Sequence, residues 1–379
     1  MQTDQVFLAA LYLLAPAGLV LLALRVSLFA KVGPIVLCYA AGLLLGLTGL
    51  LPESGAEIRT SITEASLGLA LPLLLFAVDV RAWGHVAGRA MLSMLLAVIA
   101  VVALATALYH LFTSQGVERV EQLSGMAVGM YTGGIANMGA IKLALGIPDA
   151  RYLLFATVDT VVGSIYLLFV LTMAPRVLGG FLPGFTTDKN ADPEPLPTEA
   201  QNRSGMVVPG LVAFSAAVLC VGLAVVLAPM LPFANPQILT IVLLTTFGIA
   251  GSFLPALRLN RAAPHMGMYL IYVFSFCVAA SMDLTALAGM DMSILVFCVA
   301  ATFGSFALHA LLARFARIDR DTFLITSVAA VMSPAFVPMV SRSLRNPAIL
   351  MSGMATGILG FAIGNYLGIS LALLLAGKG

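Results

Sequence analysis

The chain has 379 residues, of which 61% are hydrophobic and only 9% are charged, and its formal net charge is +2. A soluble domain has about 25% charged residues, and a soluble fold of this size exposes too much surface to hide so many apolar side chains. The composition therefore predicts an all-α polytopic membrane protein. A charge so close to zero, with no basic stripe, excludes a nucleic-acid partner.

The chain contains twelve apolar segments, most of them about 20 residues long, which is the helix length that crosses a bilayer. Those of the first half lie at 6–29, 33–51, 60–80, 88–113, 123–147 and 150–175, and those of the second half at 206–230, 236–256, 266–288, 292–313, 322–341 and 348–377. The long polar stretch between them, 186–204, contains three prolines and six charged residues, which is typical of a solvated linker. We therefore expect an internal duplication, with a first repeat over 1–179, a polar cytoplasmic linker over 180–205 and a second repeat over 206–379.

The positions of Lys and Arg residues indicate the membrane topology, because cytoplasmic loops carry an excess of these residues. If all twelve segments span and the N-terminus is outside, five arginines between positions 258 and 320 face outward. If the fifth and eleventh segments instead enter and leave on one face, fourteen Lys and Arg residues are cytoplasmic and four are outside. The charge bias thus favours two inverted repeats, each with about five transmembrane helices plus one broken or re-entrant hairpin. The alternative is that both segments cross fully as broken helices, which requires an extra or a missing span elsewhere.

The first of these segments is interrupted by Gly133 and Gly134. An adjacent glycine pair breaks a helix because it has the largest backbone entropy cost. Unwound backbone at membrane depth is tolerated only where it is buried in protein or lines a cavity, and Thr132 and Asn137 add polar side chains there. We interpret these four residues as a substrate-binding element; the alternative is that the glycines only permit close helix packing.

The second segment is interrupted by Pro334 and Pro338, each of which removes a backbone donor. Ser333, Ser341 and Arg342 lie beside them in the sequence. Because paired interrupted segments indicate a transporter site, we assign Ser333, Pro334, Ser341 and Arg342 to substrate binding as well. A helix that is merely kinked is the alternative reading.

Asp159 lies far from either end of an otherwise apolar segment. An intramembrane carboxylate is costly unless it is paired or faces water, so it is functional by default. We predict an ion-coupling site at Asp159, Thr160 and Asn365, the last of which lies in the final segment; a structural hydrogen bond is the alternative for Asp159. Lys142 either pairs with Asp159, meets a substrate carboxylate, or extends to water.

Several of these residues also carry a family resemblance. The stretches Tyr131–Gly139, Ala144–Ile147 and Gly357–Gly368 resemble motifs of the YjcL-like integral membrane proteins, a bacterial and plastid family with a domain of unknown function. The resemblance covers nearly the whole chain. That family is similar to elevator-type sodium-coupled carriers of the bile-acid, glutamate and citrate symporter group, which implies a panel domain and a mobile core that carries the substrate.

The second interrupted segment departs from the family pattern. When the two are aligned on Pro334, the two Asn of the family fall on Val328 and Ala330, and its two Gly fall on Met332 and Ser333. A cation site built from those Asn side chains is therefore not expected in this chain.

These observations favour a secondary active transporter of elevator type. We expect it to move a small, anionic organic solute and to couple this movement to Na⁺ or H⁺. We expect a multi-pass protein of the cell inner (plasma) membrane that forms a homodimer, is not an enzyme, and binds no metal or cofactor, with Na⁺ as the one candidate exception. The alternative class is a non-transporting membrane protein, such as a receptor or an intramembrane enzyme. No ATP-binding loop of the GxxxxGK[ST] type is present in the sequence.

The charge count generates a topology prediction. In a background without native cysteines, Ser204→Cys should react with membrane-impermeant maleimide only from the cytoplasmic side, and Thr3→Cys only from outside. Labelling of both positions from the same face would contradict the arrangement of ten spans and two hairpins.

Overall fold

The computed structural model describes residues 2–26, 29, 33–48, 51–52, 55–78, 88–185, 207–231, 236–281 and 292–377. Throughout these ranges the regular structure is helical, which confirms the prediction of an all-α polytopic membrane protein. From residue 186 to its end at residue 205 the predicted linker lies outside the described residues.

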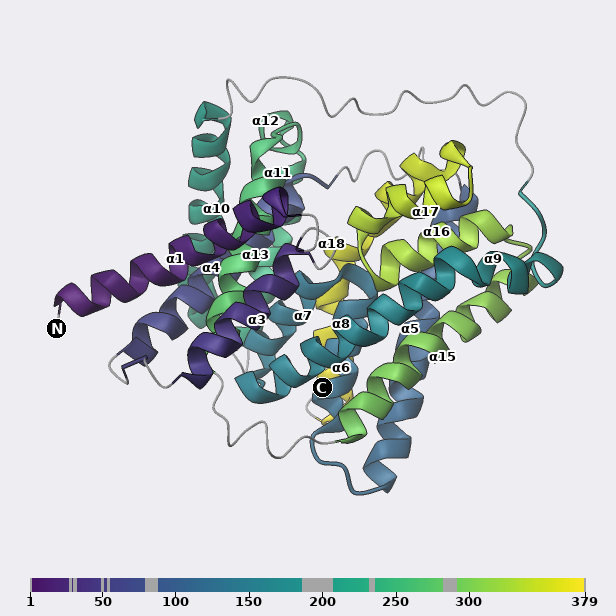
Figure 1. Cartoon of the computed structure of the whole chain (residues 1–379), viewed down its shortest axis with the longest axis horizontal. Helices are drawn as coiled ribbons and strands as arrows, with labels where there is room; N and C mark the ends of the chain where they lie inside the picture. Colours follow the sequence, from purple (N-terminus) through teal and green to yellow (C-terminus); the bar gives the residue numbers. More distant parts are fainter. Residues whose placement is uncertain are drawn as a thin grey trace. The chain divides into compact units, whose positions relative to one another are not determined.

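The helices of the first half follow the predicted segments (Figure 1). They are α1 (Gln2–Arg25), α3 (Pro34–Leu47), α4 (Ala56–Phe76), α5 (Gly88–Ser114), α6 (Val120–Gly133), α7 (Ile135–Leu145), α8 (Asp149–Thr172) and the short α9 (Ala174–Val177) with η3 (Leu178–Gly180).

The second half repeats this order of long and interrupted helices. Its elements are α10 (Val207–Leu227), η4 (Ala228–Met230), α11 (Pro236–Ser252), α12 (Pro255–Arg258), α13 (Ala262–Ala280), α15 (Met292–Phe315), α16 (Arg320–Val331), η5 (Pro334–Phe336), α17 (Val337–Ser343), η6 (Pro347–Ile349) and α18 (Leu350–Leu375).

Eight helices in the described part of the chain are long and apolar enough to cross a membrane, four in each half. The expected spans at 33–51 and 236–256 form shorter helices, α3 with 14 residues and α11 with 17. At 1.5 Å per residue these helices are about 21 and 26 Å long, which is less than the roughly 30 Å of a hydrocarbon core. Within the described residues, each half thus has four full-length helices and one short one where five spans were expected.

The chain divides into two compact units, and each takes stretches from both halves. The first unit comprises 1–77, 142–156 and 206–291, and the second comprises 78–141, 157–205 and 292–379. The predicted repeats are divisions of the sequence, whereas these units are divisions of packing and cut across the repeats. The inverted relation of the repeats stays a prediction.

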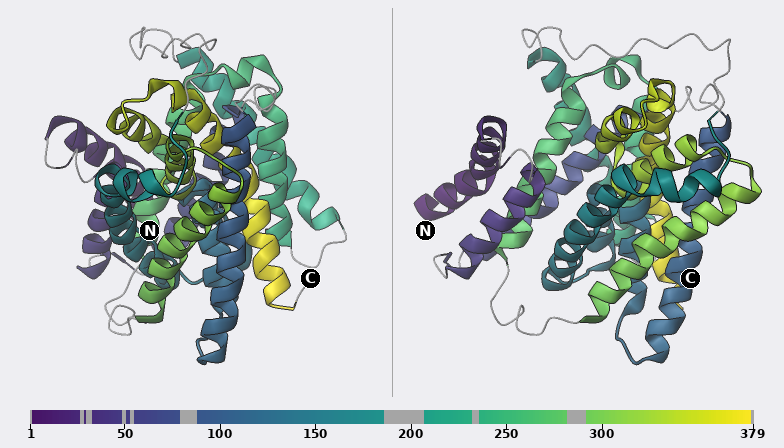
Figure 2. Two further views of the ribbon diagram at one scale, coloured as in Figure 1. Left: turned by 90° about the vertical axis from the view of Figure 1, so that its right-hand side faces the viewer. Right: turned by 45° about the vertical axis from the view of Figure 1, so that its right-hand side comes forward.

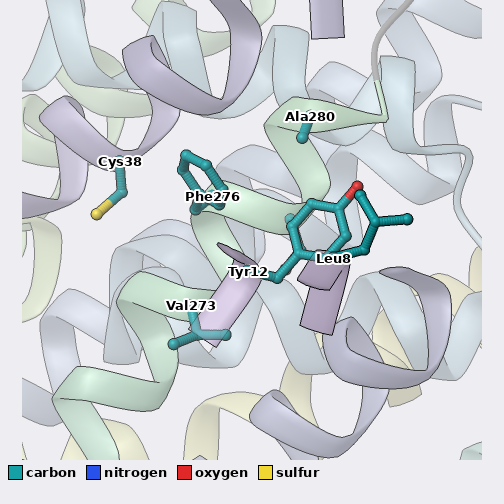
Figure 3. Packing of buried hydrophobic residues seen from close by; sticks show 7 residues of the cluster. Leu8, Tyr12, Cys38, Val273, Phe276 and Ala280 are labelled. Atoms are coloured by element: carbon teal, nitrogen blue, oxygen red, sulfur yellow. The ribbon is translucent and has the colours of Figure 1, made fainter. Parts of the chain in front are cut away.

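In the first unit, α13 packs against α3 and α4. Glycines allow this close approach: a Cβ at Gly267 would lie 2.8 Å from Cγ of Leu74, and one at Gly42 would lie 2.9 Å from Cβ of Ala279. Next to these contacts, Tyr12 of α1 meets Phe276 edge to face, with ring centroids 6.3 Å apart (Figure 3). Buried side chains of these three helices pack together here, and they therefore anchor α1 to the α3–α13 pair.

In the second unit, α15 runs beside α5 and α18 beside α6 (Figure 2). The side of α18 that faces its neighbours is a row of glycines. Its members are Gly353, Gly357, Gly360, Gly364 and Gly368, all buried. A row without side chains lets whole backbones come into contact.

The segment at 123–147 folds back on itself along this seam. A Cβ at Gly125 of α6 would lie 3.6 Å from Cγ2 of Ile141 in α7, although a straight helix would separate these residues by about 24 Å. Gly129 likewise lies against Ile141 and Asn137. Helices α6 and α7 therefore form a helical hairpin, called hairpin 1 below.

The segment at 322–341 folds back in the same way. A Cβ at Gly353 would lie 2.5 Å from Cγ1 of Ile325 and 3.0 Å from Cγ1 of Val337, so α16 and α17 contact the same turn of α18. We call α16, η5 and α17 hairpin 2. Both interrupted segments are thus hairpins rather than continuous crossing helices.

The seam generates a stability prediction. A Cβ at Gly360 would collide with the carbonyl oxygen of Thr132 and lie 3.0 Å from Cε of Met94. Because a backbone carbonyl cannot rotate away, Gly360→Ala should destabilise the protein by about 1–3 kcal/mol, measured as a lower Tm in detergent.

The matched control is Gly222→Ala on α10, where a new Cβ meets nothing within 4 Å. This change should leave stability unchanged or raise it by about 0.5–1 kcal/mol through helix propensity. Equal effects of the two substitutions would contradict the close approach at Gly360.

Candidate functional site

The tips of the two hairpins meet inside the second unit. Hairpin 1 turns at Gly134, with φ 76°, and hairpin 2 turns at Ser333, with φ 141°. A Cβ at Gly134 would lie 3.8 Å from Cβ of Ser333 and 4.0 Å from Cε1 of Phe361. The structure therefore brings together the two sequence breaks that were predicted to carry the site.

At the tip of hairpin 1, polar side chains hold the broken segment in place. Asn137 donates from Nδ2 to the carbonyl oxygens of Gly360 and Phe361 on α18, at 3.3 Å each. Thr132 donates to the carbonyl oxygen of Val128, one turn earlier, at 2.6 Å. Both side chains are fully buried, and Gly133 leaves the space that Asn137 occupies. Asn137 thus joins hairpin 1 to α18, so its role includes packing as well as any contact with substrate.

The tip of hairpin 2 has an unusual backbone. Ser333 has φ 141° and ψ 166°, a region that is essentially restricted to glycine, and a non-glycine residue there costs about 1–3 kcal/mol. Pro334 follows as the first residue of η5 and packs on Gly357, where a Cβ would lie 2.7 Å from Cγ of the proline. Strain of this kind persists only where the surrounding structure enforces it, and it concentrates at functional sites.

Asp159 is 6% exposed in the middle of α8 and faces the Tyr131 side chain at the end of α6. One turn later on α8, a Cβ at Gly163 would lie 3.2 Å from Sδ of Met332, beside the tip of hairpin 2. Thr160 is partly exposed. Asn365 is fully buried on α18, directly after Gly364, which lies against Thr132 and Asn137. The predicted ion-coupling residues therefore belong to the same unit as both tips.

Lys142 and Ser341 are not part of this arrangement. Lys142 belongs to the first unit, where its ammonium group forms an ion pair with Asp149. The alternative of a pair between Lys142 and Asp159 is therefore wrong. Ser341 donates to the carbonyl oxygen of Asn346 at 2.9 Å, about 12 Å along the chain from the tip of hairpin 2. The side chain of Arg342 lies outside the described part of the structure.

Helix α15 carries buried polar residues that the sequence argument did not assign to the site. They recur at helical spacing on one face and are Cys298, Thr302, Ser305 and His309, each at most 2% exposed. Tyr131 contacts the first two of them. Their spacing could have predicted this face, because polar residues at intervals of four, three and four in an apolar span indicate a buried helix face.

At the other end of this face, His309 joins a hydrogen-bonded chain. Nε2 of His309 lies 3.2 Å from Oγ of Ser93, which lies 2.6 Å from Oγ1 of Thr326. Thr326 donates to the carbonyl oxygen of Thr322 at 2.8 Å, so the Ser93 hydroxyl donates to Thr326 and accepts from Nε2–H of His309. A small cavity bordered by Ser305, His309 and Ser327 adjoins this chain.

The model of one protein family matches residues 9–377 of the chain, and its description is "Protein of unknown function (DUF819)". Because the match covers nearly the whole chain, the chain belongs to this family. No curated protein matches the chain at a significant level.

The backbone of Ser333 generates a second stability prediction. Because glycine adopts φ 141° without steric cost, Ser333→Gly should stabilise the protein by about 1 kcal/mol or more, measured as a higher Tm in detergent. The control Ser370→Gly, at an exposed position of α18, should lower stability by a few tenths of a kcal/mol. A destabilising Ser333→Gly would show that its backbone is not strained.

Proposed function

We propose that this member of the DUF819 family is a secondary active transporter of elevator type for a small anionic organic solute, coupled to Na⁺ or H⁺. The observation that carries the proposal is the meeting of two helical hairpins at Gly134 and Ser333 within one compact unit. Unwound backbone inside a membrane is stable only where protein buries it or a polar cavity solvates it. Paired breaks of this kind are the usual place where transporters bind their substrates.

The preference for an anion follows from the ends of helices at the tips. The 11-residue helix α7 begins at Ile135, directly after Gly134, so its first backbone N–H groups and the positive end of its dipole lie beside the tip. Negatively charged groups bind favourably at such a terminus. In this proposal the solute contacts Gly133, Gly134 and Ser333, whereas Thr132, Asn137 and Pro334 fix the backbones that bind it.

The division of the chain supports the elevator type. The second unit contains both tips, Asp159 and Asn365, so a site built from them is able to move as part of one body. The first unit supplies the long apolar helices α1 and α10, in which Val6, Phe7, Val208 and Leu211 are more than 60% exposed. In this proposal those faces contact lipid of the inner membrane or a second copy in a homodimer.

Counterflow in liposomes tests transport and the role of Asp159 together. Asp159→Asn should abolish ion-dependent uptake, because it removes the charge that binds the coupling ion. The protein should stay folded, because the change removes a charge from an apolar setting and keeps the shape.

The matched control is Asp149→Asn, which removes a carboxylate from the first unit and should leave ion coupling intact. Uptake that stays fully ion-coupled in Asp159→Asn would contradict the role of Asp159. If no organic anion exchanges in the wild-type protein, the assignment as a transporter is wrong.

Gly134 tests the substrate site separately. A Cβ there would lie 3.8 Å from Cβ of Ser333, so a larger side chain would occupy the space between the two tips. At φ 76° a branched side chain would also strain the backbone. Gly134→Val should therefore block uptake by filling the tip, whereas Gly146→Val, with a similar positive φ and open surroundings, should cost some stability and leave uptake in place. Equal uptake by both variants would place the substrate away from the tips.

A further inference from the structure

Four buried side chains from three helices meet beside hairpin 1, and we call them the Asp159 cluster. They are Tyr131 at the end of α6, Asp159 in α8, and Cys298 with Thr302 in α15. Tyr131 is 1% exposed, Cys298 and Thr302 are fully buried, and Asp159 is 6% exposed. The cluster thus places a carboxylate and two hydroxyl groups in an apolar interior.

The Tyr131 hydroxyl lies within interaction reach of both Thr302 and Asp159, but within the described residues neither its Oη nor Oγ1 of Thr302 reaches the geometry of a normal hydrogen bond. A buried hydroxyl without a partner costs about 1–3 kcal/mol, and a buried carboxylate without compensation costs more. Two buried hydroxyl groups that lie beside a carboxylate without normal hydrogen bonds are an arrangement that a ligand between the three side chains would satisfy.

We infer that the Asp159 cluster binds one monovalent alkali cation, Na⁺, through the oxygen atoms of Asp159, Tyr131 and Thr302. One carboxylate neutralises one unit charge, whereas a divalent ion would leave a net positive charge in the apolar interior. Hard cations prefer oxygen ligands, so the Cys298 sulfur lines the site without coordinating the ion.

A proton fits this geometry less well. Protonation of Asp159 adds one O–H donor, which bonds to one oxygen at a time, and it places no atom between the three side chains. A cation coordinates the lone pairs of all three side chains at once.

The position of Tyr131 gives the site a consequence for coupling, which rests on the proposed function. Tyr131 directly precedes Thr132 and the Gly133–Gly134 break, so a bound ion would join the end of α6 to α8 and α15. The ion would thereby hold the tip of hairpin 1 in the form that binds the solute, which is positive coupling between two ligands.

Thermal unfolding of the purified protein in detergent tests the ion site without any transport. At constant pH and ionic strength, replacing choline chloride by NaCl should raise the unfolding midpoint of the wild-type protein in a saturable manner. Tyr131→Phe and Thr302→Val should each raise the half-saturating Na⁺ concentration about 3- to 10-fold, and Asp159→Asn should abolish the response. Thr302→Ser, which keeps the hydroxyl, should respond as the wild type does.

The first unit offers matched controls. Tyr12 and Ser275 also have buried hydroxyl groups without a partner at normal geometry, so Tyr12→Phe and Ser275→Ala make the same chemical change away from the cluster. Both should keep the wild-type Na⁺ response. Equilibrium binding of ²²Na⁺ to the wild-type protein provides a measurement that needs no variant to fold.

The outcomes separate this inference from the proposed function. A wild-type midpoint that ignores Na⁺, absence of ²²Na⁺ binding, or Tyr131→Phe and Thr302→Val variants that titrate like the wild type would overturn the ion site. Proton-driven uptake without Na⁺ binding would overturn the ion site and leave the transporter standing. Na⁺ binding at the cluster without any solute uptake would support the ion site and overturn the proposed transport function.

Discussion

The close approach of α18 to both hairpins is the constraint on which the second unit depends. Backbone groups released at a helix break must be satisfied within the protein, because hydrocarbon offers no partners. The glycine row of α18 meets this requirement by letting the carbonyl groups of Gly360 and Phe361 reach Asn137 of hairpin 1. The same row accepts Pro334 and Ile325 of hairpin 2. Side chains at these positions would separate the backbones, and the two tips would lose the surface that brings them together.

Polar side chains in this unit divide into bonded and unbonded groups. Thr132, Asn137, Ser93 and Thr326 all donate to partners at normal distances, and they fix helices against one another. The hydroxyl groups of Tyr131 and Thr302 converge near Asp159 without such bonds. Satisfied networks stabilise a single packing, whereas converging unsatisfied groups indicate a place for a ligand. This contrast, rather than polarity alone, separates the candidate ion site from the structural hydrogen bonds around it.

Parts of the site could be predicted because they depend on intrinsic backbone preferences. Adjacent glycines at 133 and 134 and a proline at 334 break a helix in any context, and the structure has its breaks at these points. Asp159 could be predicted as a candidate because a carboxylate in an apolar span is costly wherever it lies. Thr302 was missed because a hydroxyl in a helix is inexpensive when it bonds to its own backbone, and only its neighbours reveal that it has no partner. The pairing of Lys142 with Asp149 was not foreseen, because both residues lie near segment ends and several partners were open to the lysine.

The sequence by itself determined that this is an all-α membrane protein. It also determined the approximate limits of the apolar segments and the points where two of them break. These properties follow from composition and from local backbone energetics, which act over a few residues. The tertiary structure decided that α3 and α11 are short, that the compact units draw on both halves of the chain, and that Gly134 lies beside Ser333. It also decided which polar side chains converge on Asp159. Contacts between residues more than a hundred positions apart depend on how whole helices pack. The glycines of α18 could pack against many helices, and only the tertiary structure decides that they contact the two hairpins.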